Sequence, residues 1–190
     1  MLRTVPGNVT FECMPTPLQS RALRFLVLFV GLYLVGYLSY DLYLQQHSTH
    51  QDPATELVAQ RGLSFANTIS SNTFTATWTD ADGMYVSTAG NENFVRIVEG
   101  CNGLAVVILF IAFVIGIAFK PLSWFTLRFA LFGSLFLYGI NLARVALLIV
   151  WMNRFPEYTD LLHDIIFPGI IYGSVILLWL VWIKIDTRRG

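Results

Sequence analysis

The fold class follows from residues Cys101–Phe119, which read CNGLAVVILFIAFVIGIAF and contain no charge before Lys120. A helix of about 20 apolar residues is long enough to cross a hydrocarbon core about 30 Å thick. Three further windows are as long and predominantly apolar: Ala22–Leu44, Trp124–Trp151 and Ile165–Ile183. Because open sheet edges do not exist in lipid, we predict that all four windows are transmembrane helices.

The composition of the whole chain agrees with this interpretation. Of 190 residues, 55% are hydrophobic and 13% are charged, with 12 basic and 12 acidic residues, and the mean hydropathy is +0.61. Such a chain is too apolar for a disordered protein and has too few charges for an ordinary soluble surface. It also lacks the basic excess with which proteins neutralise nucleic-acid phosphates. We therefore predict a small polytopic membrane protein in contact with lipid and without a nucleic-acid partner.

The basic residues predict the orientation, because cytoplasmic loops carry an excess of Lys and Arg. With the N-terminus inside, eight basic residues are cytoplasmic and three are outside, while Arg144 lies near the outer boundary of the third helix. The cytoplasmic set is Arg3, Arg21, Arg24, Lys120, Arg128, Lys184, Arg188 and Arg189, and the outer set is Arg61, Arg96 and Arg154. Both termini are then cytoplasmic.

Four segments follow from this topology. Residues 1–21 form a cytoplasmic tail, in which prolines and the lack of an apolar core argue against a cleavable signal peptide, and residues 22–44 form an uncleaved anchor helix. Residues 45–100 form a small extracytoplasmic α/β cap, and residues 101–190 form a three-helix membrane core. In the cap, Asp52-Pro53 predicts a helix to about Asn67, and alternating residues from Phe74 onward predict two or three short strands with a turn at residues 80–83. The predicted fold class is an all-α integral membrane protein with four transmembrane helices and this cap.

Three reactive residues are predicted to lie at one depth. At 1.5 Å per helical residue, Cys101 lies about 28 Å from Lys120, Arg144 about 30 Å from Trp124, and His163 about 31 Å from Lys184. Three helices thus bring a thiol, a guanidinium and an imidazole to the outer membrane interface. Cys13, on the cytoplasmic side, is too far from Cys101 for a disulfide.

These three side chains have complementary chemistry. We expect Cys101 at the N-terminus of the second helix, where a thiolate nucleophile is stabilised. His163 would exchange protons with the thiol and with a leaving amine, and Arg144 would stabilise an oxyanion. Two supporting residues share a helical face with their partners at a spacing of three: Asp160 with His163, and Asn141 with Arg144.

Each residue also has a structural interpretation when considered alone. Cys101 suits a small buried apolar position, Arg144 suits snorkelling to outer headgroups, and His163 suits an ordinary place at the interface. The shared depth favours the catalytic interpretation. A haem or metal site is disfavoured because one membrane histidine does not supply the usual ligands, so no cofactor is expected.

At these residues the sequence resembles the exosortase/archaeosortase family, most closely its short exosortase F-type branch. The resemblance covers about residues 94–183 and is carried by three motifs in order. They are EGCNGL at Glu99–Leu104, NLARVALL at Asn141–Leu148 and HDIIFP at His163–Pro168.

The resemblance implies a membrane-embedded cysteine peptidase or transpeptidase of the bacterial cytoplasmic membrane, with Cys101, Arg144 and His163 as its catalytic set. Its substrates would be exported proteins that end in a short motif, one transmembrane helix and a basic tail. Their sorting signals would be processed at the outer face of the membrane.

Two other functions remain open at this stage. A non-catalytic membrane subunit that assists protein export or envelope assembly would explain the helices and the cap. A thiol–disulfide carrier would normally need a second cysteine on the same side, and the chain has none there.

Overall fold

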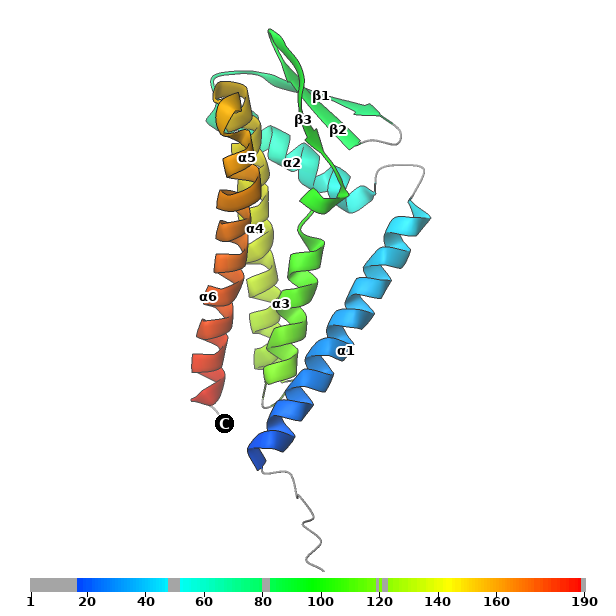
Figure 1. Cartoon of the computed structure of the whole chain (residues 1–190), viewed down its shortest axis with the longest axis vertical. Helices are drawn as coiled ribbons and strands as arrows, with labels where there is room; N and C mark the ends of the chain where they lie inside the picture. The colour runs from blue at the N-terminus through cyan, green and yellow to red at the C-terminus, as the bar shows by residue number, and fades with distance from the viewer. Residues whose placement is uncertain (1–16, 48–51, 80–82, 119, 121–122, 189–190) are drawn as a thin grey trace, which may run out of the picture.

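The computed structural model describes residues 17–47, 52–79, 83–118, 120 and 123–188. It combines a bundle of long helices with a small sheet at one end (Figure 1). The bundle helices are α1 (Pro17–Gln46), α3 (Leu104–Ile117), α4 (Trp124–Arg154) and α6 (Phe167–Thr187). The segment between α1 and α3 contains α2 (Pro53–Ile69), β1 (Phe74–Thr79), β2 (Gly83–Thr88), β3 (Asn91–Ile97) and the 3-10 turn η1 (Glu99–Cys101). Between α4 and α6 lie η2 (Pro156–Tyr158), α5 (Thr159–Leu161) and η3 (Leu162–Ile166).

Three helical stretches of the described chain are long and apolar enough to cross a membrane: Arg21–Gln46, Trp124–Arg154 and Pro156–Thr187. They expose large apolar side chains, such as Val35 at 65% and Phe132 at 67%. Extended apolar surface of this kind marks contact with membranes or other proteins. The prediction of a helical membrane protein agrees with these three stretches.

The second predicted span in chain order is shorter in the structure than the sequence predicts. The window Cys101–Phe119 yields α3, which has only 14 residues, or about 21 Å of helix. Its start is delayed because Gly103 adopts a positive φ of 75°, and it ends where Ala118 becomes extended. By length, α3 falls below the roughly 30 Å of a hydrocarbon core.

The core of the bundle forms around α3. Phe110 and Val114 of α3 pack with Leu137 of α4 and with Val175 and Trp182 of α6. On its other side, α3 lies against α1 (Figure 1). This short helix is therefore enclosed by the three longer ones.

We call residues 52–98 the cap. Its helix α2 begins as predicted, with Asp52 as N-cap accepting a hydrogen bond from Thr55 N at 2.9 Å, and it continues to Ile69. The three strands form an antiparallel sheet in the order β1-β2-β3, at the upper limit of the predicted number. Residues 80–82 of the predicted turn lie outside the described residues.

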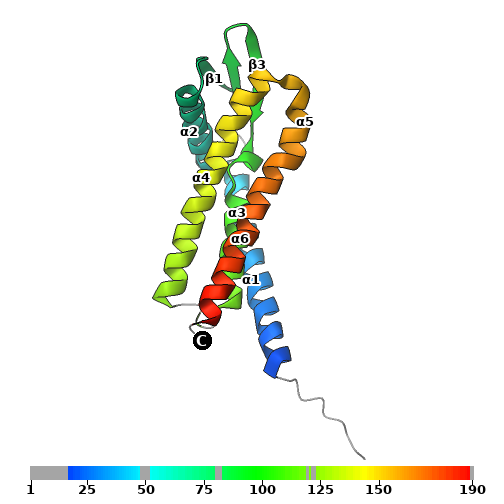
Figure 2. The same ribbon diagram turned by 90° about the vertical axis from the view of Figure 1, so that its left-hand side faces the viewer.

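The cap is docked on the second half of α4. One core joins Val58 and Ala59 of α2 and Met84 of β2 with Val145 and Ala146 of α4, among other residues. Figure 2 shows α2 and the strands beside the upper end of α4, with α6 on the other side. Residues 141–149 of α4 therefore lie at the junction between the cap and the bundle.

Candidate functional site

The segment that carries Cys101 is a tight loop rather than the first turn of a helix. Cys101 ends η1, and its N–H donates to Val98 O at 2.8 Å. Helix α3 begins only at Leu104, whose N–H donates to Asn102 Oδ1 at 2.9 Å. The prediction that Cys101 occupies the N-terminus of the helix is therefore wrong, because Gly103, in a left-handed conformation, is the N-cap of α3 and Cys101 lies two residues before it.

Asn102 also ties this loop to two other helices. Its side chain is buried, and its Nδ2 donates to Tyr40 Oη of α1 at 2.7 Å and to Thr55 Oγ1 of α2 at 3.1 Å. The sequence interpretation missed this role. The available signal was a polar amide inside an otherwise apolar window, because buried polar groups need partners.

Asn141 holds the same loop from the side of α4. It is 3% exposed, and its Nδ2 donates to the backbone carbonyl of Cys101 at 2.8 Å. Its Oδ1 accepts from Arg144 Nη1 at 3.5 Å. The predicted pairing of Asn141 with Arg144 is thus present in the structure, and the amide additionally connects Arg144 with the Cys101 loop.

Arg144 faces a cavity of about 260 Å³, which we call the Arg144 cavity. Its walls come from the Cys101 loop at Gly100 and Asn102, from Asn141 beside Arg144, and from Pro168 of α6. The Nε atom of Arg144 is buried and has no hydrogen-bond partner in the described chain. A buried guanidinium donor without a partner can bind a ligand oxygen at little additional cost, because its hydration has already been lost.

The thiol of Cys101 lies on the other side of its loop. Cys101 is a free cysteine of intermediate exposure that packs against the core of the cap, and it is not one of the residues that line the Arg144 cavity. Cys13 lies outside the described residues. The backbone of residue 101 is thus beside the Arg144 cavity while its sulfur points toward the cap.

His163 lies in η3, a π-helical turn, and its side chain is 53% exposed. Its Nδ1 is 2.9 Å from Asp164 Oδ1. Asp160, the carboxylate predicted to orient it, is exposed. Within the described ranges, no hydrogen bond joins Asp160 to His163, or His163 to Cys101 or Arg144.

The structure therefore brings together Cys101, Asn141 and Arg144 through the backbone and amide contacts above, and leaves His163 on the surface with Asp164. In the described ranges, no group of three or more His, Cys, Asp or Glu side chains is placed to hold a metal ion. Comparison with known proteins found no matching family model, no matching curated protein and no matching solved structure.

Proposed function

We propose that this chain is a membrane-embedded cysteine peptidase or transpeptidase that processes the C-terminal sorting signals of exported proteins. The observation that carries the proposal is the hydrogen bond from Asn141 Nδ2 to Cys101 O, at 2.8 Å. It ties the backbone of Cys101, the residue that carries the only thiol of the described chain, to the helix turn that presents Arg144. Arg144 and the two neighbours of Cys101, Gly100 and Asn102, line a cavity large enough for a short piece of extended peptide.

The proposed reaction begins with the thiolate of Cys101. It attacks the carbonyl carbon of the scissile peptide bond, and Arg144 donates hydrogen bonds to the oxyanion of the tetrahedral intermediate. When the C–N bond breaks, His163 gives its proton to the leaving amine, and a thioester remains on Cys101. An acceptor amine or water then attacks the thioester and loses its proton to His163, and the C–S bond breaks to release the Cys101 thiolate, which restores the starting thiolate and protonated imidazole.

The proposed reaction requires two side-chain movements. Cys101 must turn its sulfur from the cap core toward the Arg144 cavity, a rotamer change of the kind that is fast in proteins. His163 must approach from η3, which ends two residues before Pro168 of the cavity wall. Asp164 at Nδ1 would hold the imidazole with Nε2 free for proton transfer.

The proposed topology follows the eight-to-three distribution of basic residues. All four bundle helices cross the cytoplasmic membrane, with α3 enclosed by the other three, and both termini are cytoplasmic. The cap and the Arg144 cavity then face outward. A substrate anchored by its own C-terminal helix would present its scissile bond at this level.

The test compares two cysteine variants in the native host. In cells that express Cys101→Ala, exported proteins with a C-terminal motif, helix and basic tail should remain at full length on a blot. Cys13→Ala is the matched control, because it removes the only other cysteine, and it should process these substrates as the wild type does. Normal processing by Cys101→Ala would refute the proposal.

A non-catalytic membrane subunit is the second candidate. The packing of the Cys101 thiol against the cap core and the exposure of His163 favour it. In that case, deletion of the gene would impair export or assembly, and Cys101→Ala would restore both fully.

A further inference from the structure

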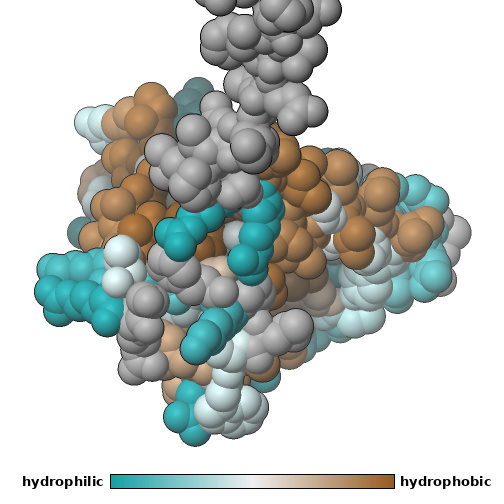
Figure 3. Space-filling view, turned by 90° about the horizontal axis from the view of Figure 1, so that it is seen from below, coloured by the Kyte–Doolittle hydropathy of each residue, from teal (hydrophilic) through white to brown (hydrophobic). Residues whose placement is uncertain are grey.

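A second cavity lies at the end of the bundle opposite the cap, between α1, α3 and α6. We call it the Arg21 cavity; its volume is about 370 Å³, within the range of about 300–1,000 Å³ that is typical of small-molecule sites. Its apolar wall includes Phe25, Ile117 and Ile183. Figure 3 shows this end of the molecule, where hydrophilic side chains meet a broad hydrophobic surface.

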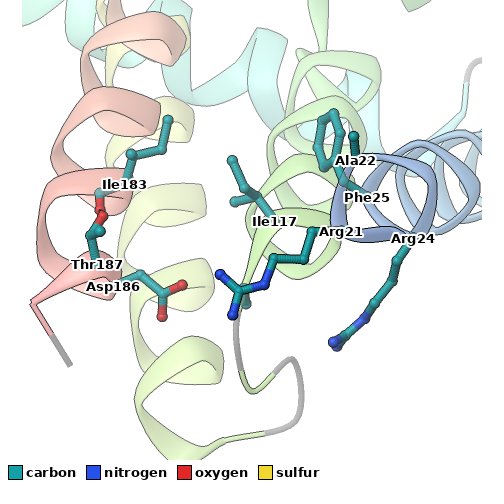
Figure 4. A pocket seen from close by; sticks show the side chains of 10 residues that line it. Arg21, Ala22, Arg24, Phe25, Ile117, Ile183, Asp186 and Thr187 are labelled. Carbon is teal, nitrogen blue, oxygen red and sulfur yellow. The ribbon is translucent and has the colours of Figure 1, made fainter. Parts of the chain in front are cut away.

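The polar groups of the cavity lie at its mouth. Arg21 and Arg24 come from the first turns of α1, and Asp186 comes from the last turn of α6. Figure 4 shows Arg21 extending from α1 toward Asp186, while Arg24 lies on the far side of Arg21 from α6. Two guanidinium groups and one carboxylate leave one net positive charge at the entrance of an apolar cleft.

The surroundings of the mouth are also basic. Lys184 lies on α6 two residues before Asp186, Arg188 directly follows α6, and Lys120 follows the end of α3. Asp186 is the only acidic residue among the described residues at this end of the bundle. A ligand with a single negative charge and an apolar body would complement both parts of the cleft.

We propose that the Arg21 cavity binds an anionic phospholipid. Its phosphodiester lies at Arg21 and Arg24, and the upper part of an acyl chain fills the cleft against Phe25, Ile117 and Ile183. Planar guanidinium groups form paired hydrogen bonds with phosphate oxygens, and basic pockets between transmembrane helices are suited to anionic headgroups. The site uses none of Cys101, Arg144 and His163, so it does not depend on the proposed peptidase function.

Native mass spectrometry of the purified full chain in detergent tests the proposal, with titrations of phosphatidylglycerol and phosphatidylethanolamine. The wild type should bind phosphatidylglycerol more tightly. Arg24→Gln should weaken this binding by about five-fold, because a cation near an anionic lipid surface contributes about 1 kcal/mol. Arg128→Gln is the matched control, since Arg128 lies at the same end but packs over the Trp124 ring at 5.1 Å, outside the cavity.

A second variant tests the apolar part of the site. Ala22 lines the cavity and is exposed, so Ala22→Trp should fill the cleft without disturbing the bundle core and should weaken the binding of both lipids. Excess inorganic phosphate should not displace phosphatidylglycerol, because it lacks the acyl chain. The proposal is overturned if Arg24→Gln and Arg128→Gln lose binding equally, if Ala22→Trp binds lipid as the wild type does, or if phosphate alone competes.

Discussion

At the scale of single residues, the candidate site depends on Asn141. This one side chain connects two segments 40 residues apart in sequence, because it donates to Cys101 O and accepts from Arg144 Nη1. Gly103 leaves it the necessary space, since a Cβ at that glycine would lie 3.0 Å from Asn141 Cγ. The amide, the glycine and the guanidinium therefore form one packed unit.

Gly103→Ala should disturb this unit. Gly103 has a φ of +75°, a conformation that costs an L-residue about 1–3 kcal/mol, and the added methyl group presses on Asn141. We expect a lower thermal unfolding midpoint in detergent and reduced processing. Gly100→Ala is the control, because nothing lies within 4 Å of its Cβ position. If both variants have the same thermal unfolding midpoint, the close contact of residue 103 with Asn141 does not matter for stability.

Arg144→Lys separates hydrogen-bond geometry from charge. Lysine can snorkel as arginine does, but it lacks the planar fork of donors. If Arg144 binds the oxyanion, processing should fall by about two orders of magnitude or more, because one lost oxyanion donor costs about 3–4 kcal/mol. The measurement is the ratio of processed to full-length substrate, with a blot for the enzyme.

Arg154→Lys is the matched control, since Arg154 ends the same helix and packs over the Phe155 ring at 5.8 Å. It should process substrate at the wild-type rate. Equal rates for both lysine variants would return Arg144 to a purely structural role.

The sequence could predict which residues lie near the Cys101 loop, but not where their side chains point. The helical rise per residue predicts that Cys101 and Arg144 lie at the same depth. In the structure, Asn141 hydrogen-bonds to both residues and so connects their segments. The direction of the Cys101 sulfur depends on the cap core, which is built from residues far away in sequence. Likewise, helical spacing favoured Asp160 as the partner of His163, whereas the π-helical turn places Asp164 there.

At the scale of elements, the most unusual feature is the π-helical turn Leu162–Ile166 before α6. Pro168 accounts for it, because proline has no N–H and its ring would clash with the carbonyl four residues earlier, that of Asp164. A wider turn relieves the clash and redirects His163 and Asp164. Single π turns of this kind are frequent at functional sites.

Pro168→Ala should convert the π turn to ordinary α-helix. The restored N–H can donate to Asp164 O, so the thermal midpoint should rise or stay unchanged. Processing should fall, because His163 would be turned relative to the Arg144 cavity. Gly169→Ala is the neighbouring control, with nothing within 4 Å of its Cβ position. Full activity in a more stable Pro168→Ala variant would exclude a role for the turn in positioning His163.

Long periodic elements were predictable and local breaks were not. The predicted window Trp124–Trp151 corresponds to α4, Trp124–Arg154, and the Asp52 N-cap was recognisable from its sequence. Helix α3 starts late because of the backbone conformation of Gly103. The π-helical turn before α6 depends on Pro168. The apolar composition of a window does not show where its helix is interrupted.

At the scale of the whole molecule, the orientation is the prediction on which the proposed function depends. Reporter fusions after Phe119 and after Lys184 should report the cytoplasm, and a fusion in the turn at residues 80–83 should report the outside. The physical reason is the excess of basic residues at the end opposite the cap. A cytoplasmic signal from the turn would place Cys101 on the wrong side for exported substrates.

In the proposed topology, the short length of α3 sets the depth of the Cys101 loop. The helix is about 21 Å long, about 9 Å less than a typical hydrocarbon core, and the three longer helices enclose it. The Cys101 loop, which follows the cap directly into α3, would then lie in a depression of the protein below the surrounding headgroups. A peptide bond leaving the membrane would meet the thiol there before it met bulk solvent. In vesicles of longer-chain lipids the loop would lie deeper below the headgroups, so processing should slow as the bilayer thickens.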